Sequence, residues 1–239
     1  MAQGPFYYEQ RRLENDLVAL EIFDPSVHAA QFVEALPHLS TYLILPTIKS
    51  EADFMNELYN KYIQSMPDTC LYAIINKVTA QEETEIETGK GKGKGQYAGV
   101  ISLNATNPTN AVTEIGVMIF PAWQRTHVAT NAIGLLLQYT LDPPSAGGLG
   151  LRRVEWKCHA GNEASRKTAA RMGFELEGIL RWDRVFPGGA VVLPVDALEK
   201  RNGTTGEVPG RHTAIYSIVW DEWEEKRPQV VAQMERFTR

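Results

Sequence analysis

The chain has 239 residues, of which 44% are hydrophobic and 22% charged, and its formal net charge is -5. This composition is that of a globular protein whose length allows one core, so we expect a single domain over residues 1–239. The acidic balance disfavours a dedicated nucleic-acid-binding module, which would need a basic face to neutralise phosphates. A cationic ligand would suit this balance better.

Cysteine usage and the start of the chain indicate the compartment. Cys70 and Cys158 are too few for a disulfide framework and do not stand at metal-ligand spacing with histidine, so we expect two buried thiols and no metal site. The N-terminus lacks the apolar segment of a signal peptide, and no run approaches the roughly 18 apolar residues of a membrane helix. We expect a cytoplasmic protein with no membrane partner.

The first part of the chain predicts two strands separated by two helices. Residues 17–22 alternate apolar and polar side chains as a strand does, and Asp-Pro-Ser at 24–26 supplies the cap and the first-turn proline of a helix that ends near residue 35. A second amphipathic helix is expected over 50–64, with a face of Phe54, Leu58, Tyr59 and Tyr62. Residues 70–75 then form a buried strand.

Residues 79–96 run from acidic residues into alternating glycine and lysine, a composition without apolar periodicity that predicts a flexible loop. Beyond it, the strands at 97–103 and 112–120 are joined by an Asn-Pro-Thr-Asn turn at 107–110, so we expect an antiparallel hairpin. Later elements follow in the order helix 129–141, strand 153–158, helix 162–172 stopped by Gly173, strand 174–180, long loop 186–211, strand 212–220 and helix 221–237.

The junction between the strand ending at Phe120 and the following helix is a candidate anion site. The first backbone N–H groups of a helix have no intrahelical acceptor and lie at the positive end of its dipole, so a phosphate binds there without a dedicated side chain. Arg125 would add a guanidinium group that can donate paired hydrogen bonds to the phosphate. Every such junction offers free N–H groups, so the pattern alone is a weak indication.

A resemblance gives that junction a specific meaning. The run QRTHVAT, followed by RRVEWKCHAGNEASRKTAARMGFELEGILR, resembles the RimJ/RimL-like branch of the GNAT acetyltransferases over most of the chain. In that family a Q/R-x-x-G-x-G/A loop binds the pyrophosphate of acetyl-CoA. The positions that match it, with the residue that follows, are Gln124, Arg125, Thr126, His127, Val128, Ala129 and Thr130. His127 replaces the central glycine, which either loosens the backbone contact with phosphate or adds an imidazole donor.

The second part of the resemblance is the more specific one, because N-x-x-S, A-x-x-x-G-F and E-G recur at the spacing of the family. It implies that Asn162 orients the cofactor arm and that Ser165, one turn later on the same helix face, lies near the thiolate leaving group.

The resemblance also implies an α/β fold of the GNAT type, a mixed and mostly antiparallel seven-stranded sheet flanked by helices. Its fourth and fifth strands, here 112–120 and 153–158, would separate so that the pantetheine arm of acetyl-CoA pairs with exposed backbone as an added strand does. Met118, Ile119 and Phe120 would supply most of that edge, and a backbone N–H near Val117, Met118 and Ile119 would be the donor to the thioester oxygen.

The activity that the resemblance implies is transfer of an acetyl group to a primary amine by direct attack on the thioester. Glu114 is the candidate base for the ammonium proton, and Ser165 is the candidate acid. A solvent-facing position on the strand would account for Glu114 equally well. Trp182 and Arg184 are the candidate substrate-side residues, although tryptophans at strand periodicity are more often core.

The sequence leaves several alternatives open. The acceptor is either a protein N-terminus or a small amine, and the chain is a monomer or a homodimer. A silent domain that binds acetyl-CoA without turnover, or serves as an interaction scaffold, is an alternative because a fold does not guarantee chemistry. Cys158 and His159 invite a nucleophile reading, but adjacent strand residues point to opposite faces.

Overall fold

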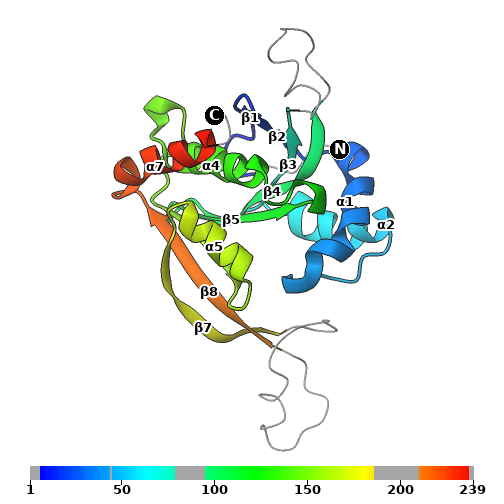
Figure 1. The fold of residues 1–239 in the computed structure, drawn as a ribbon. Coiled ribbons are helices and arrows are strands. Elements are labelled where there is room, and N and C mark those ends of the chain that lie inside the picture. Colours follow the sequence, from blue (N-terminus) through cyan, green and yellow to red (C-terminus); the bar gives the residue numbers. More distant parts are fainter. Residues whose placement is uncertain (1–5, 44, 79–94, 186–209, 237–239) are drawn as a thin grey trace, which may run out of the picture.

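The structure is a computed structural model that describes residues 6–43, 45–78, 95–185 and 210–236 (Figure 1). The expected loops at 79–96 and 186–211 lie almost entirely outside the described residues. The strands are β1 (Leu13–Glu14), β2 (Val18–Ile22), β3 (Cys70–Asn76), β4 (Gln96–Asn107), β5 (Val112–Ile119), β6 (Arg153–His159), β7 (Glu175–Val185) and β8 (Gly210–Val219). The helices are α1 (Pro25–Leu39), α2 (Glu51–Asp53), α4 (His127–Leu141), α5 (Glu163–Arg171) and α7 (Trp223–Glu235), with a π-helix, η2, over Phe54–Gln64.

All eight strands form one open sheet in the order β1-β2-β3-β4-β5-β6-β8-β7. Every neighbouring pair is antiparallel except β5 and β6, so the expected mixed, mostly antiparallel sheet is confirmed. Seven strands correspond to those expected from the sequence. The eighth, β1, has two residues, too few for a periodic pattern.

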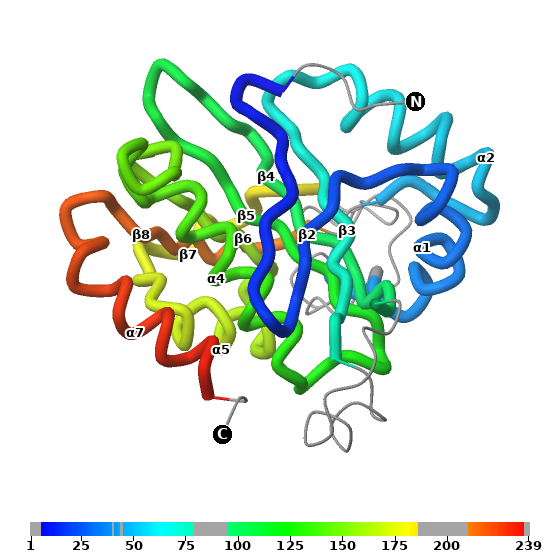
Figure 2. Tube along the Cα trace, turned by 90° about the horizontal axis from the view of Figure 1, so that it is seen from above, coloured from blue at the N-terminus to red at the C-terminus, as the bar shows by residue number. Residues whose placement is uncertain are grey.

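Two helical layers cover different parts of this sheet. Helices α4, α5 and α7 gather on one side, and α1 with α2 lies on the other side beside β2 and β3, as Figures 1 and 2 both show. The core of the first layer includes Leu136 of α4 and Trp223 of α7, and the core of the second includes Phe32 and Phe54. None of the helices in the described part of the chain has the length and apolar character needed to span a bilayer.

The second expected helix is present, but it is α-helical only in its first turn and continues as a π-helix. Ser50 caps α2 by accepting a hydrogen bond from the Asp53 N–H, and the chain then continues as the π-helix η2. A π-helix has more residues per turn than an α-helix, so its buried face moves along the sequence. Phe54 and Tyr59 are fully buried as expected, whereas Tyr62 is 59% exposed and Ile63 packs on the core instead.

Helix α7 is fastened to the end of α4 by Asp142. This buried carboxylate accepts hydrogen bonds from the Trp223 indole (2.7 Å) and from two nitrogens of Arg227 (2.8 and 3.0 Å). We expect Asp142→Ala to lower the free energy of unfolding by about 3 kcal/mol, because it leaves the buried indole N–H without an acceptor and removes a paired charge. Thermal unfolding should show a Tm lower by roughly 6–10 °C, and a Tm within 2 °C of the parent protein would contradict this account.

Candidate active site

The site is built where β5 and β6 cease to pair. These parallel strands are in register only from Val112↔Arg153 to Glu114↔Glu155, although β5 continues to Ile119 and β6 to His159. Beyond Glu114, β5 keeps its antiparallel partner β4 on one side and, among the described residues, has no strand partner on the other. We call residues 116–119 the open edge of β5. The separation expected between these two strands is thus present.

At the open edge, the backbone N–H groups of alternate residues point away from β4. The Phe120 N–H donates to the carbonyl of Ala98 in β4, so by the period of two in a strand the Met118 N–H also faces β4. The N–H groups of Val117 and Ile119 therefore face away from β4. The Ile119 carbonyl accepts a hydrogen bond from the Gln124 side chain at 3.1 Å. An extended ligand could pair with this edge as an added strand does.

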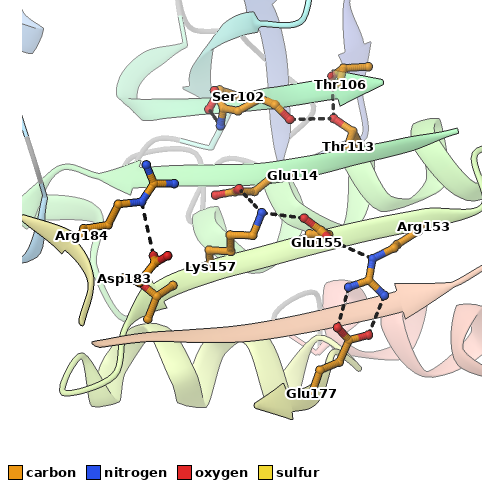
Figure 3. Close-up of polar contacts among 12 residues, drawn as sticks. Ser102, Thr106, Thr113, Glu114, Arg153, Glu155, Lys157, Glu177, Asp183 and Arg184 are labelled. Carbon is orange, nitrogen blue, oxygen red and sulfur yellow. Dashed lines mark hydrogen bonds and ion pairs between the residues drawn. The ribbon is translucent and has the colours of Figure 1, made fainter. Parts of the chain in front are cut away.

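Glu114 lies on β5 just before the open edge, on the face opposite to α4. Its carboxylate is 3.2 Å from the Lys157 ammonium of β6 (Figure 3), and its side chain is 22% exposed. Burial raises the pKa of Glu114 above the ordinary carboxyl range, an effect that Lys157 only partly offsets. A raised pKa makes a carboxylate a stronger proton acceptor, so Glu114 remains the candidate base.

The same face of the sheet continues as a row of charges. Lys157 also contacts Glu155 at 2.7 Å, Glu155 contacts Arg153, and Arg153 binds Glu177 of β7 through two bonds of 2.6 Å (Figure 3). Together with a hydrogen bond from Ser217, Arg153 lowers the pKa of Glu177 to about 2. The two carboxylates beside Lys157 outweigh the effect of burial and raise its pKa, so it remains an ammonium. Sequence periodicity did not single out Lys157 as the partner of Glu114.

Ser165 lies on the opposite face of the sheet, in the first turn of α5. Its hydroxyl oxygen accepts a hydrogen bond from the Trp156 indole at 3.0 Å. The Asn162 carboxamide caps α5 by accepting from the Ser165 N–H at 3.1 Å, a contact that fixes the start of the helix. Asn162 therefore has a structural role in this state, and its amide nitrogen remains the group that a cofactor arm could use.

The segment before α4 forms a tight turn. Arg125 is exposed and adopts a left-handed conformation (φ 63°). The Thr126 hydroxyl caps the helix by accepting from the Val128 N–H and donates to the Trp123 carbonyl. The His127 Nε2 is 2.8 Å from the side-chain oxygen of Asn76, at the end of β3. His127 thus ties α4 to the sheet through this nitrogen, which is then not directed at a phosphate.

The rest of the expected loop enters the helix. Val128 and Thr130 are buried and Ala129 is half-buried, so a phosphate here would contact backbone N–H groups of the first turn rather than side chains, although the Val128 N–H already donates to the Thr126 hydroxyl. The first turn of α4 supplies such groups as every helix does.

The substrate-side candidates lie on the β7–β8 hairpin. Trp182 is 51% exposed and has a left-handed backbone (φ 56°). Its N–H donates to His212 Nδ1 at 2.8 Å, and its ring meets His212 edge to face. A bulky residue in this conformation stores strain, which often marks a functional segment. Arg184 is exposed and contacts Asp183 at 3.3 Å (Figure 3).

Cys158 and His159 do face opposite sides of β6. Both cysteines are free and buried, as expected from the sequence, and burial raises the pKa of each thiol. Cys158 faces α5, where it lies near Ser165, whereas His159 contacts Tyr42 on the Glu114 side. A raised thiol pKa and an imidazole on the other face do not make a nucleophile pair.

Comparisons with known proteins agree with this architecture. The acetyltransferase (GNAT) domain family matches residues 20–175, well over half of the chain. The ribosomal-protein-serine acetyltransferase of Escherichia coli is 34% identical over 86 residues, which are 36% of this chain and 45% of that protein. The match thus spans less than half the length of this curated relative.

Solved structures resemble the chain over more of its length. A GCN5-related N-acetyltransferase from Brucella melitensis has a TM-score of 0.70 and 26% identity, with 97% of this chain and 89% of that chain covered. RimL, a ribosomal L7/L12 α-N-protein acetyltransferase in complex with coenzyme A, has a TM-score of 0.58 and 19% identity, with 88% and 99% covered. The second likeness shows the fold alone. With its family match and its sheet opened between β5 and β6, the chain belongs to the acetyltransferase (GNAT) domain family.

Proposed function

We propose that the protein is an acetyl-CoA-dependent N-acetyltransferase that transfers the acetyl group to a primary amine by direct attack on the thioester. The observation that carries this proposal is the open edge of β5, which has a candidate base on one face of the sheet and a candidate acid on the other. Because one sheet includes strands from Leu13 to Val219, we take residues 1–239 as a single domain.

The chain fits acetyl-CoA in two respects. The Ile119 N–H faces away from β4 and is suitably directed to pair with an amide of a pantetheine arm. The turn formed by Gln124, Arg125 and Thr126 leads into the N-terminus of α4, a position that binds phosphate through backbone N–H groups. When bound, acetyl-CoA would supply an activated acyl group. Coenzyme A in the RimL structure supports this ligand class.

Residues around the open edge have separate roles as base, hydrogen-bond donor and acid. Glu114 accepts the ammonium proton of the acceptor, directly or through one water, and burial raises its pKa, which makes the carboxylate a stronger proton acceptor. The Val117 N–H is a fixed donor toward developing negative charge on the acyl oxygen. The Ser165 hydroxyl, held by Trp156, provides a proton for the departing sulfur. Trp182 and Arg184 contact the acceptor amine substrate.

The acceptor class follows from the relatives only as a proposal. The Escherichia coli relative is named a ribosomal-protein-serine acetyltransferase, and RimL is described as an α-N-protein acetyltransferase. These names favour a peptide or protein amine, and small amines remain in the assay because the matched segment of the curated relative is short.

The test measures release of free coenzyme A from acetyl-CoA by titration of its thiol. The acceptors are peptides with different N-termini and a panel of small amines. We expect acceptor-dependent release. In Ser165→Ala, kcat/KM should fall at least about tenfold, a loss of about 1.4 kcal/mol of transition-state stabilisation. The Tm should fall only slightly, because one hydrogen bond to Trp156 is lost. Thr168→Ala is a matched control, since it removes a hydroxyl that bonds only its own helix.

An alternative with different readouts is a silent domain that binds acetyl-CoA. It predicts saturable binding of acetyl-CoA without coenzyme A release for any acceptor. Steady acceptor-dependent release would exclude it.

A further inference from the structure

Two arginines face one another on the β7–β8 hairpin. Arg184 of β7 is the register partner of Arg211 of β8, so both lie on one face of the sheet. Like charges directly opposite one another on neighbouring strands are destabilising. Asp183 contacts Arg184 at 3.3 Å, and the Arg184 side chain is 60% exposed. The pair therefore needs a physical reason beyond stability, which an anionic ligand between the two guanidinium groups would provide.

Arg211 is the more constrained of the two. Its Nε donates to the Thr213 hydroxyl at 3.0 Å, and its Nη1 lies 3.5 Å from the Tyr42 carbonyl. Within the described ranges, no carboxylate makes an ion pair with it. Burial lowers the pKa of Arg211, and the charge of Arg184 lowers it further. Asp183 and Glu114 attract Arg211 only from beyond ion-pair distance. A half-buried guanidinium with no carboxylate in contact among the described residues is a candidate site for an anion.

His159 adds an unsatisfied donor beside Arg211. Its residue is 4% exposed, and its Nδ1 accepts a hydrogen bond from the Gly161 N–H at 2.9 Å. The neutral ring therefore carries its proton on Nε2, and this buried group has no hydrogen-bond partner in the described part of the chain. The Tyr42 ring packs against His159 with 5.4 Å between centroids. A buried N–H without an acceptor is costly unless a ligand supplies one.

These groups lie on the face that carries Glu114. His159 pairs with Thr213 and Glu155 pairs with Glu114, so the alternation of the strands puts His159 and Glu114 on the same side of the sheet. Glu114 is close enough to Arg211 and Arg184 to interact electrostatically with both. Positive groups thus lie to one side of the proposed base.

We propose that Arg184, Arg211 and His159 form an anion site that recognises a carboxylate carried by the acceptor amine. The inference rests on the proposed function and names the substrate class of that same site. A carboxylate would neutralise the facing arginines, take paired hydrogen bonds from a guanidinium, and accept from His159 Nε2 once the Tyr42 ring moves aside. The ammonium of the same acceptor would lie toward Glu114, so the site is complementary to a molecule with opposite charges at its two ends.

The experiment compares acceptors that differ only in carboxylate versus carboxamide. One pair is a peptide with Glu or Gln after its N-terminal residue, and another is 4-aminobutanoate and its amide. The parent protein should prefer the carboxylate in kcat/KM by about tenfold or more, the usual effect of a charge-assisted hydrogen bond. If only the peptides show the preference, the acceptor is a peptide or protein. If only 4-aminobutanoate and its amide show it, the acceptor is a small amine.

Variants assign the preference to the arginines. Arg211→Gln should bring the ratio near one, and Arg184→Gln should reduce the ratio in part. Arg171→Gln, at the end of α5 on the other face, makes the same charge change and should leave the ratio unaltered. Because Arg184 is exposed, its variant decides the question if Arg211→Gln fails to fold.

A binding measurement separates this inference from the proposed function. The dissociation constants of the N-acetylated carboxylate and carboxamide products are measured by titration calorimetry. If no acceptor turns over, the proposed function fails, and the affinity ratio of the two products still decides the anion site. A ratio near one in the parent protein, or a preference that persists in both arginine variants, would overturn the inference.

Discussion

Replacing Glu114 by Gln should lower kcat/KM by about 10²-fold or more, because it removes a positioned general base and preserves the size of the side chain. The acid limb of the pH profile should also disappear. In the parent protein, burial raises the pKa of Glu114, so the active ionised form is lost as pH falls through that raised value. The measurement is kcat/KM against pH for both proteins with one acceptor.

The stability of the same variant distinguishes a catalytic from a structural role. A carboxyl whose pKa is raised on folding binds more protons folded than unfolded, so its cost to stability is absent at low pH and is fully present above the raised pKa. Glu114→Gln removes this cost, and Lys157 keeps its contact with Glu155. At neutral pH the Tm should therefore hold or rise. A fall of 10 °C, or parent-like activity, would mean that Glu114 is a structural partner of Lys157 alone.

Val117→Pro should lower kcat by about 10²- to 10³-fold, the usual effect of removing one donor to developing charge on oxygen. Proline lacks the N–H, and this N–H faces away from β4, so no sheet hydrogen bond is expected to be lost. The measurement is single-turnover coenzyme A release at saturating acetyl-CoA. It is accompanied by calorimetric affinity for coenzyme A, because pantetheine would use the same edge.

Two controls make this result specific. Val117→Ala keeps the N–H and trims a side chain that packs on the core, so it should retain most of the activity. Met118→Pro removes an N–H that faces β4 and should lower the Tm instead. Unchanged turnover in a folded Val117→Pro protein would falsify the assignment of the open edge to the acyl oxygen.

Local patterns in the sequence predicted the elements and some of their ends, although α1 continues to Leu39 instead of ending near residue 35, and β7 continues to Val185 instead of residue 180. The positive φ of Gly173 (88°) ends α5 where a left-handed cap was predicted, and Asn162 caps its start. The hairpin of β4 and β5 follows its turn. These features depend on residues close together in the chain, so periodicity and capping rules are sufficient. The roles of Ser165 and of the other candidate site residues stay predictions.

Tertiary structure alone decided the surroundings of those candidates. Lys157 meets Glu114, Asn76 meets His127, and Arg184 comes opposite Arg211 through pairings between distant segments. Register fixes such neighbours, and β7 changes register against β8 twice, between Leu176 and Gly178 and between Leu180 and Arg184. An irregularity of this kind moves side chains to new partners without a clear local pattern. The sequence by itself therefore determined which residues carry charge and hydrogen-bonding groups, and only long-range strand pairing determined which of them face one another.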